Sequence, residues 1–100
     1  MEISATELKG QYNDPEKTWV ILDVREELEF HTFNIGGDNI PLGILLRTID
    51  ELDYNKQQEI IVVCQHGLRS ETARRVLEQN GYLNVKNLRG GLLAWRKLSQ

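Results

Sequence analysis

Cysteine is almost absent from this 100-residue chain, in which Cys64 stands alone. One cysteine cannot form an internal disulfide, and a metal site built on paired cysteine ligands is excluded. No stretch approaches the roughly 20 apolar residues that cross a membrane, and the N-terminus lacks a basic segment followed by an apolar run. We therefore expect no membrane partner and a cytoplasmic location.

An excess of positive charge is absent as well. The chain has 12 Lys and Arg against 15 Asp and Glu, its net charge is −3, and its basic residues are scattered. This balance excludes a general attraction for nucleic acid. The length allows one small domain over residues 1–100, and 40% hydrophobic with 27% charged residues is typical of a folded globular protein.

Low-complexity tracts and long linkers are also absent, and short apolar runs alternate with segments of helical spacing. Extended segments are predicted at residues 19–22, 39–40, 60–64 and 84–88. One helix is predicted to start at the capping box formed by Ser4 and Glu7, and a second to open after Pro41. Further helices are predicted around Leu28, after the loop that follows Cys64, and over residues 92–98. This alternation predicts an α/β fold with a largely parallel sheet.

Helical spacing also assigns residues to the core. Five residues after Pro41 form one apolar face that we expect to be buried: Leu42, Leu45, Leu46, Ile49 and Leu52. Gly90 and Gly91 are predicted to form a tight turn before the last helix, and Trp95 is expected in the core.

Cys64 follows the apolar run 60–63 and precedes a helix-like stretch. A strand would deliver the sulfur to the edge of the sheet, and a helix start would surround it with N–H groups that favour a thiolate. An isolated cysteine after such a run is usually a small buried hydrophobe. A nucleophile is favoured here because Gly67 allows a tight turn, Arg69 is a permanent cation and Ser70 is expected to cap the helix.

These residues carry a resemblance to a known family. The segment 64–70 resembles the active-site loop of the rhodanese family of sulfurtransferases, and three further segments resemble its signatures in the same order: Leu22–Arg25 with Glu29, Asn39–Pro41, and Leu88–Trp95. The resemblance covers nearly the whole chain. It implies a rhodanese-like α/β fold, with a central, largely parallel five-stranded sheet and helices on both faces.

The resemblance also implies a chemistry, because rhodanese-like enzymes carry a sulfane sulfur on a cysteine as a persulfide. Cys64 would be the catalytic residue, a small anion such as thiosulfate the donor, and cyanide or a thiol the acceptor. No cofactor and no metal are expected. The substrate-binding loop would comprise six residues: Gln65, His66, Gly67, Leu68, Arg69 and Ser70.

Individual charged residues have more than one interpretation. Arg69 is expected to dock the anionic end of the donor, because a guanidinium holds two oxygens at once, and the alternative is a solvated surface arginine. His66 is either a base, a donor to the substrate, or a side chain in water. Asp23 and Arg25, at one strand end, are expected to play a structural role near the site by bonding neighbouring loops.

The chain departs from the family pattern at Phe33-Asn34-Ile35, where the family usually has Gly-His-Ile. Phe33 lacks the backbone freedom of a glycine, so the family pattern does not predict the shape of that loop.

Alternative functions are a persulfide carrier for one sulfur-accepting protein, a non-catalytic interaction module, and a cysteine-dependent phosphatase or arsenate reductase. The last class has five residues between its cysteine and arginine, whereas four intervene here.

Overall fold

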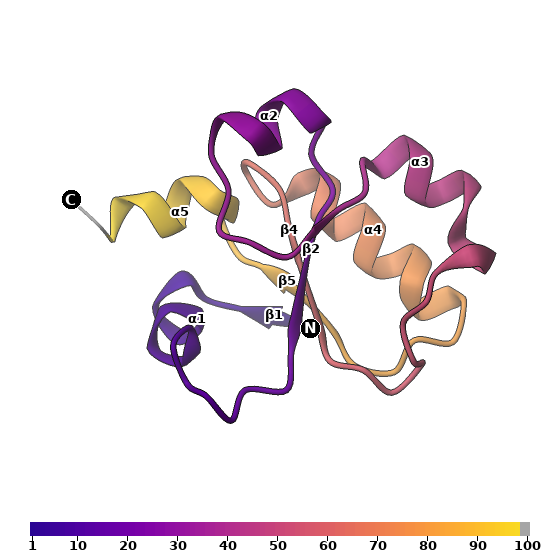
Figure 1. Cartoon of the computed structure of the whole chain (residues 1–100), viewed down its shortest axis with the longest axis horizontal. Helices are drawn as coiled ribbons and strands as arrows, with labels where there is room; N and C mark the ends of the chain where they lie inside the picture. Colours follow the sequence, from indigo (N-terminus) through magenta and orange to yellow (C-terminus); the bar gives the residue numbers. More distant parts are fainter. Residues whose placement is uncertain (99–100) are drawn as a thin grey trace.

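Five parallel strands form a single sheet in the computed structural model, which describes residues 1–98. The sheet has the order β1-β5-β4-β2-β3, so β4 is central (Figure 1). The strands are β1 (Glu2–Ile3), β2 (Val20–Asp23), β3 (Asp38–Asn39), β4 (Ile60–Val63) and β5 (Val85–Leu88). The predicted α/β fold with a five-stranded sheet is confirmed, and every strand pair is parallel.

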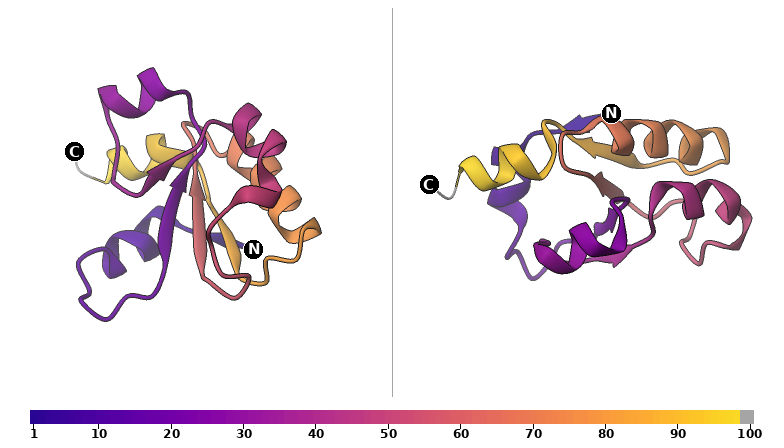
Figure 2. Two further views of the ribbon diagram at one scale, coloured as in Figure 1. Left: turned by 45° about the vertical axis from the view of Figure 1, so that its right-hand side comes forward. Right: turned by 90° about the horizontal axis from the view of Figure 1, so that it is seen from above.

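Helices cover both faces of the sheet, as the alternation predicted (Figures 1 and 2). One face carries α1 and α5, which pack against each other, and the other carries α3 and α4. The short helix α2 lies beyond the carboxyl ends of the strands (Figure 1). The helices are α1 (Ala5–Gln11), α2 (Glu27–Thr32), α3 (Leu42–Arg47), the 3₁₀ turn η1 (Ile49–Glu51), α4 (Leu68–Gln79) and α5 (Gly91–Lys97). No helix in residues 1–98 is long and apolar enough to cross a membrane.

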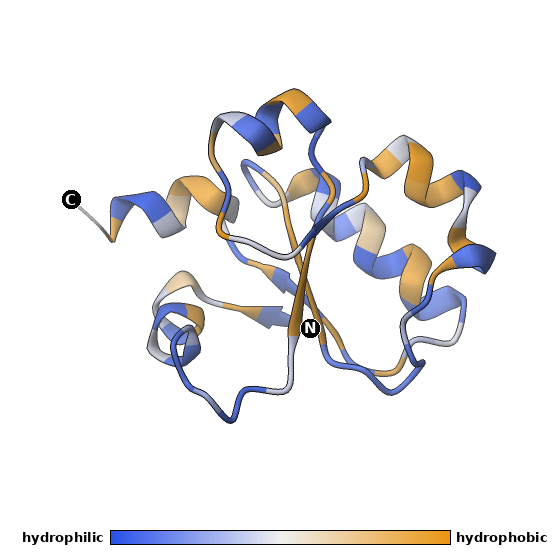
Figure 3. Ribbon diagram, in the orientation of Figure 1, coloured by the Kyte–Doolittle hydropathy of each residue, from blue (hydrophilic) through white to orange (hydrophobic). Residues whose placement is uncertain are grey.

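Two layers of core result from the pleat of the strands, whose successive side chains point to opposite faces. All four residues of β4 are buried, because both of its faces are covered, and this strand is apolar along its length (Figure 3). Ile61 and Val63 pack in the layer under α1 and α5, together with Trp95. Ile60 and Val62 pack in the layer under α3 and α4.

The capping box at the start of α1 is confirmed. The Ser4 hydroxyl accepts from the Glu7 backbone N–H, and the Glu7 carboxylate accepts from the Ser4 N–H, both at 3.0 Å. Satisfying two free N–H groups explains why the helix begins there. Ile3 and Leu8, on either side of this turn, are buried in the same core layer.

The predicted apolar face after Pro41 is partly wrong. The helix ends at Arg47 and a 3₁₀ turn follows, so the spacing does not continue to Leu52 as one helix. Leu45 is completely buried, but Leu46 is 43% exposed. Adjacent helical residues point about 100° apart, and α3 turns Leu45 toward the sheet, which leaves Leu46 at the surface.

Candidate functional site

Cys64 lies directly after β4, at the carboxyl edge of the sheet, and is 1% exposed. Its sulfur accepts backbone hydrogen bonds from Gly67 at 3.1 Å and Ser70 at 3.3 Å. The hydroxyl of Ser70 lies 3.2 Å from the same sulfur. Two backbone N–H groups therefore donate to Sγ, and such donors stabilise a negatively charged sulfur.

Gly67 makes this arrangement sterically accessible. It is the N-cap of α4 with φ +93°, a left-handed conformation that a residue with a Cβ rarely adopts. The expectation that Ser70 caps the helix is wrong, because α4 begins at Leu68 and Ser70 lies inside its first turn. The first-turn N–H of Ser70 instead points at Sγ, where the positive end of the helix dipole adds to the field.

Asn87 holds the far side of Ser70. It is a polar residue on β5, only 3% exposed, and its side-chain oxygen accepts from the Ser70 hydroxyl. Its side-chain nitrogen donates to the carbonyl of Gly67 at 3.1 Å. Asn87 thus fixes both residues whose N–H groups meet Cys64. Asn87 was not predicted as a site residue, although an asparagine inside a strand is unusual and would have been the signal.

The N-terminus of α5 holds the loop from the opposite side. The N–H of Leu92 donates to the carbonyl of Cys64 at 2.8 Å, and the N–H of Leu93 donates to that of Gln65 at 3.1 Å. These bonds turn the two carbonyl oxygens toward α5. Gly91 permits this approach, because a Cβ at this position would lie 2.4 Å from the Gln65 oxygen. The predicted turn at Gly90 and Gly91 is confirmed, with φ of +75° and +64°.

Arg69 forms a two-point ion pair with Glu29 of α2. Its two terminal nitrogens lie 2.7 and 2.9 Å from the two carboxylate oxygens, and both side chains are 37% exposed. These bonds lower the pKa of Glu29 to about 2 and raise the pKa of Arg69. Glu29 was not predicted as the partner of Arg69, from which it is 40 residues away in sequence. His66 and Leu68 are exposed, and Gln65 is half-buried.

Asp23 and Arg25 form a buried ion pair at the end of β2, with 0% and 3% of each side chain exposed. The Arg25 guanidinium also donates to the backbone carbonyls of Glu29 and Phe33, at 3.3 and 2.6 Å. Arg25 thereby connects the strand end to both ends of α2. No bond joins Asp23 or Arg25 to Cys64 in the described part of the chain. Asp23 lies beside Val63, the residue before Cys64, in the pairing of β2 with β4.

Phe33 replaces the expected glycine without strain. Its backbone is extended, with φ −159° and ψ 134°, a conformation open to any residue. Its half-buried ring packs against the core layer of α1 and α5. Asn34 braces the following turn, because its side chain donates to the Phe30 carbonyl and accepts from the Gly36 N–H, both at 2.9 Å.

Known proteins share the sequence pattern and the fold of this chain. Residues 4–98 match the family model of the rhodanese-like domain. The chain belongs to the rhodanese-like domain family. Among solved structures, the rhodanese-related protein of Thermoplasma volcanium has a TM-score of 0.83 and 32% identity, covering 97% of this chain and 91% of that one.

Relatives of this rhodanese-like chain carry sulfur-transfer names. The "Putative sulfur carrier protein YrkF" of Bacillus subtilis is 38% identical over 95 residues, which are 94% of this chain and 50% of the relative. A protein of Allochromatium vinosum named "Sulfurtransferase" is 32% identical over 96 residues, 96% of this chain and 88% of the relative. The chain spans about half the length of the first of these.

Proposed function

We propose that this rhodanese-like domain is a sulfurtransferase that carries a sulfane sulfur as a persulfide on Cys64. The observation that supports the proposal most directly is the pair of backbone N–H groups, from Gly67 and Ser70, that donate to Sγ, with the Ser70 hydroxyl 3.2 Å away. Groups fixed in this way stabilise negative charge without reorganising during the reaction. A purely structural buried cysteine needs no such donors.

The first step transfers sulfur from an anionic donor such as thiosulfate. The Cys64 thiolate attacks the outer sulfur of the donor and forms the new S–S bond. The S–S bond of thiosulfate breaks, and its electron pair leaves on sulfite. The charge then resides on the outer persulfide sulfur, where the N–H groups of the loop from Gln65 to Ser70 stabilise it.

The second step regenerates the cysteine. Cyanide or an acceptor thiolate attacks the outer sulfur, the bond to Sγ breaks, and its electron pair returns to Cys64. The products are thiocyanate or a new persulfide. Because the chain has one cysteine, no internal thiol can resolve the intermediate, and the acceptor must come from outside.

Arg69 is proposed to attract the donor anion while it remains paired with Glu29. Arg69 is the second residue of α4, directly after the loop that follows Cys64, and Glu29 lies on α2. The guanidinium has five N–H donors, and the two bonds to Glu29 use only two of them. We also propose a cytoplasmic location, where thiols are kept reduced.

A dedicated persulfide carrier is the second candidate, supported by the name of the Bacillus subtilis relative. It shares every step at Cys64 with a general sulfurtransferase and differs in the acceptor, which would be one protein. Trapping partners through a mixed disulfide at Cys64 separates the two: a single dominant protein favours the carrier, and none favours small-molecule acceptors.

Intact-mass spectrometry after incubation with thiosulfate tests the proposed function. The wild-type chain should gain one sulfur, and cyanide should remove it with release of thiocyanate. Cys64→Ser, checked for folding by circular dichroism, should gain nothing. The proposal is wrong if the wild type gains no sulfur from thiosulfate or another sulfane donor, or if Cys64→Ser gains it equally.

A further inference from the structure

A pocket of about 470 Å³ adjoins the active-site loop. Its wall comes from α2, the segment after it, the loop and α5, and includes Leu28, Glu29, Thr32, Phe33, Gln65 and Arg96. Pockets of this volume accommodate organic molecules, whereas thiosulfate or cyanide would fill a small part of it. The proposed donor therefore does not account for the pocket.

Most charges at this pocket already have partners. Glu29 is paired with Arg69, and Arg25, which also lines the pocket, is bonded to Asp23 and two carbonyls. Arg96 differs, because its exposed guanidinium lies 4.5 Å over the ring of Phe33 and no carboxylate within residues 1–98 pairs with it. Arg96 is thus the pocket cation available to an anionic ligand.

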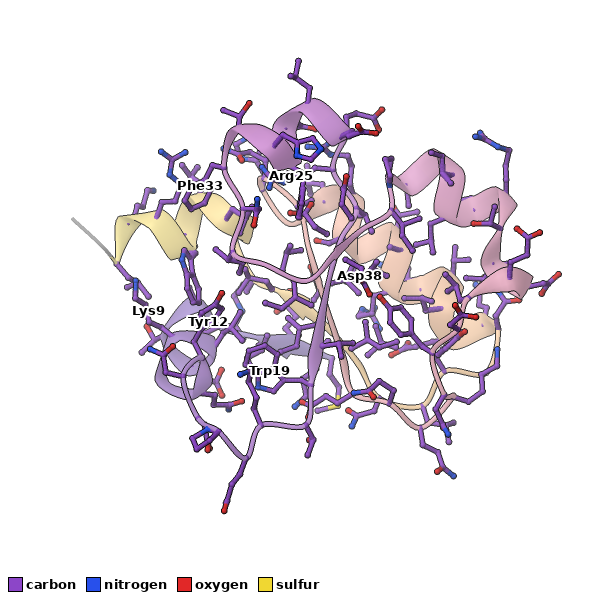
Figure 4. All side chains as sticks on the ribbon, in the orientation of Figure 1. Lys9, Tyr12, Trp19, Arg25, Phe33 and Asp38 are labelled. Carbon is purple, nitrogen blue, oxygen red and sulfur yellow. The ribbon has the colours of Figure 1, made fainter. Side chains whose placement is uncertain are left out.

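Apolar surface stands next to this cation. Leu28 on α2 is 80% exposed, and the half-buried ring of Phe33 carries the stacked guanidinium (Figure 4 shows Phe33). Stacking on an aromatic ring restrains an arginine without neutralising its charge. The wall therefore suits a ligand with a carboxylate at one end and an aliphatic or peptide-like body.

The pocket is fixed relative to the catalytic sulfur by the backbone. Gln65, in its wall, follows Cys64 directly, and the Gln65 carbonyl accepts from the N–H of Leu93 at 3.1 Å. Leu93 belongs to the same helix as Arg96, so one short helix connects the loop to the pocket cation. A ligand bound there lies beside the loop that would hold the persulfide.

We infer that this pocket binds the acceptor of the second step, and that the acceptor is an anionic low-molecular-weight thiol whose carboxylate pairs with Arg96. The inference rests on the proposed sulfur transfer. The thiol loses its proton to solvent, its sulfur bonds to the outer persulfide sulfur, and the bond to Cys64 breaks with its electron pair returning to Sγ. The acceptor leaves as its own persulfide.

Glutathione and its diethyl ester are matched probes, because the ester keeps the thiol and removes the carboxylate charges. Single-turnover rates of the persulfide-loaded chain are measured with both. Arg96→Gln should raise the half-saturating glutathione concentration about tenfold, as expected for a lost charge-assisted hydrogen bond, and affect the ester far less. Arg96→Lys should recover part of the loss. Lys97→Gln, which removes the same charge one residue later, should match the wild type.

Equal losses with glutathione and its ester, or an equal loss in Lys97→Gln, would overturn the assignment. A second measurement is independent of catalysis: unreactive S-methylglutathione is titrated into the unmodified chain and followed by the amide NMR signals of Phe33 and Gln65. Saturable shifts that weaken in Arg96→Gln support the pocket, and their absence overturns it. If no persulfide forms with any donor, the proposed function fails while this titration still decides the pocket.

Discussion

The hydroxyl oxygen of Ser70 lies 3.2 Å from the sulfur of Cys64 while its proton is directed to Asn87. A small rotation would redirect that proton to a thiolate. Ser70→Ala removes this donor and should slow persulfide formation about tenfold at neutral pH, because a hydrogen bond to a charged group is lost. Single-turnover mass spectrometry with thiosulfate measures the rate. Thr72→Ala, on the exposed side of α4, should react at the wild-type rate.

Asn87→Asp tests the residue behind this hydroxyl. The substitution preserves shape but places a negative charge one hydroxyl away from the sulfur, where it opposes a thiolate in a buried setting. Persulfide formation should fall by more than tenfold at pH 7 and recover partly as the pH rises. A wild-type pH profile for Asn87→Asp would show that Asn87 does not act on Cys64.

Local patterns were sufficient to predict most of the fold. The run Ile60–Val63 and the capping box at Ser4 each involve neighbours in sequence, so periodicity and spacing reveal them. Leu46 was predicted to be buried beside Leu45, but one helix cannot turn two adjacent side chains toward the sheet, and the spacing gave no sign that α3 ends at Arg47. The two-residue strand β1 was missed because it is defined by its parallel partner β5, not by its own sequence.

The loop that follows Cys64 could be predicted from the sequence, but the residues that hold this loop in place could not. Cys64 and the residues up to Ser70 form a contiguous motif, whereas Asn87 and Glu29 reach it across 17 and 40 residues. Neither has a spacing that a single sequence reveals. Arg69 could be identified as a cation near the sulfur, but its carboxylate partner depended on where α2 packs.

The Arg69–Glu29 pair should control donor affinity. Arg69→Ala removes the cation and should raise the KM for thiosulfate about tenfold, because a charge-assisted contact is lost. Glu29→Gln removes a negative charge that opposes a dianionic donor, and a glutamine still suits the third position of a capping box. It should lower the KM about threefold. Steady-state thiocyanate formation gives both values.

The control for this pair is Glu27→Gln, an exposed carboxylate on α2 whose partner is His31. It removes the same charge from the same helix away from Arg69, and its KM should stay within twofold of the wild type. An unchanged KM in Arg69→Ala would contradict the proposed role of Arg69. A raised KM in Glu29→Gln would show that the carboxylate helps the donor by orienting the guanidinium.

Gly91→Ala should damage both stability and activity. The added Cβ would lie 2.4 Å from the carbonyl oxygen of Gln65, at a residue with φ +64°, so α5 must move away from the loop. We expect a loss of about 1–3 kcal/mol in the free energy of unfolding, measured with urea, and slower persulfide formation. Gly10→Ala, inside α1 with open space around it, should stabilise the chain by up to ~1 kcal/mol.

Acid should weaken the chain through Glu71, in the first turn of α4. Arg74, at 2.7 Å, and Arg75 lower its pKa from 4.5 to about 2. A lowered carboxyl pKa adds stability that is fully present above pH 4.5 and is lost as the pH falls through about 2. With the side chain 31% exposed, solvent screening reduces this contribution to about 1 kcal/mol.

Glu71→Gln isolates that contribution, because glutamine cannot titrate. Urea unfolding of the wild type and the variant should differ by about 1 kcal/mol at pH 7, and the difference should shrink as the pH falls from about 5 toward 2. High salt should reduce it at pH 7, since the pair is partly exposed. Glu16→Gln, an exposed carboxylate with no ion pair in residues 1–98, should show no such pH-dependent difference. A gap for Glu71→Gln that is constant with pH would mean that packing, not charge, supplies the stability.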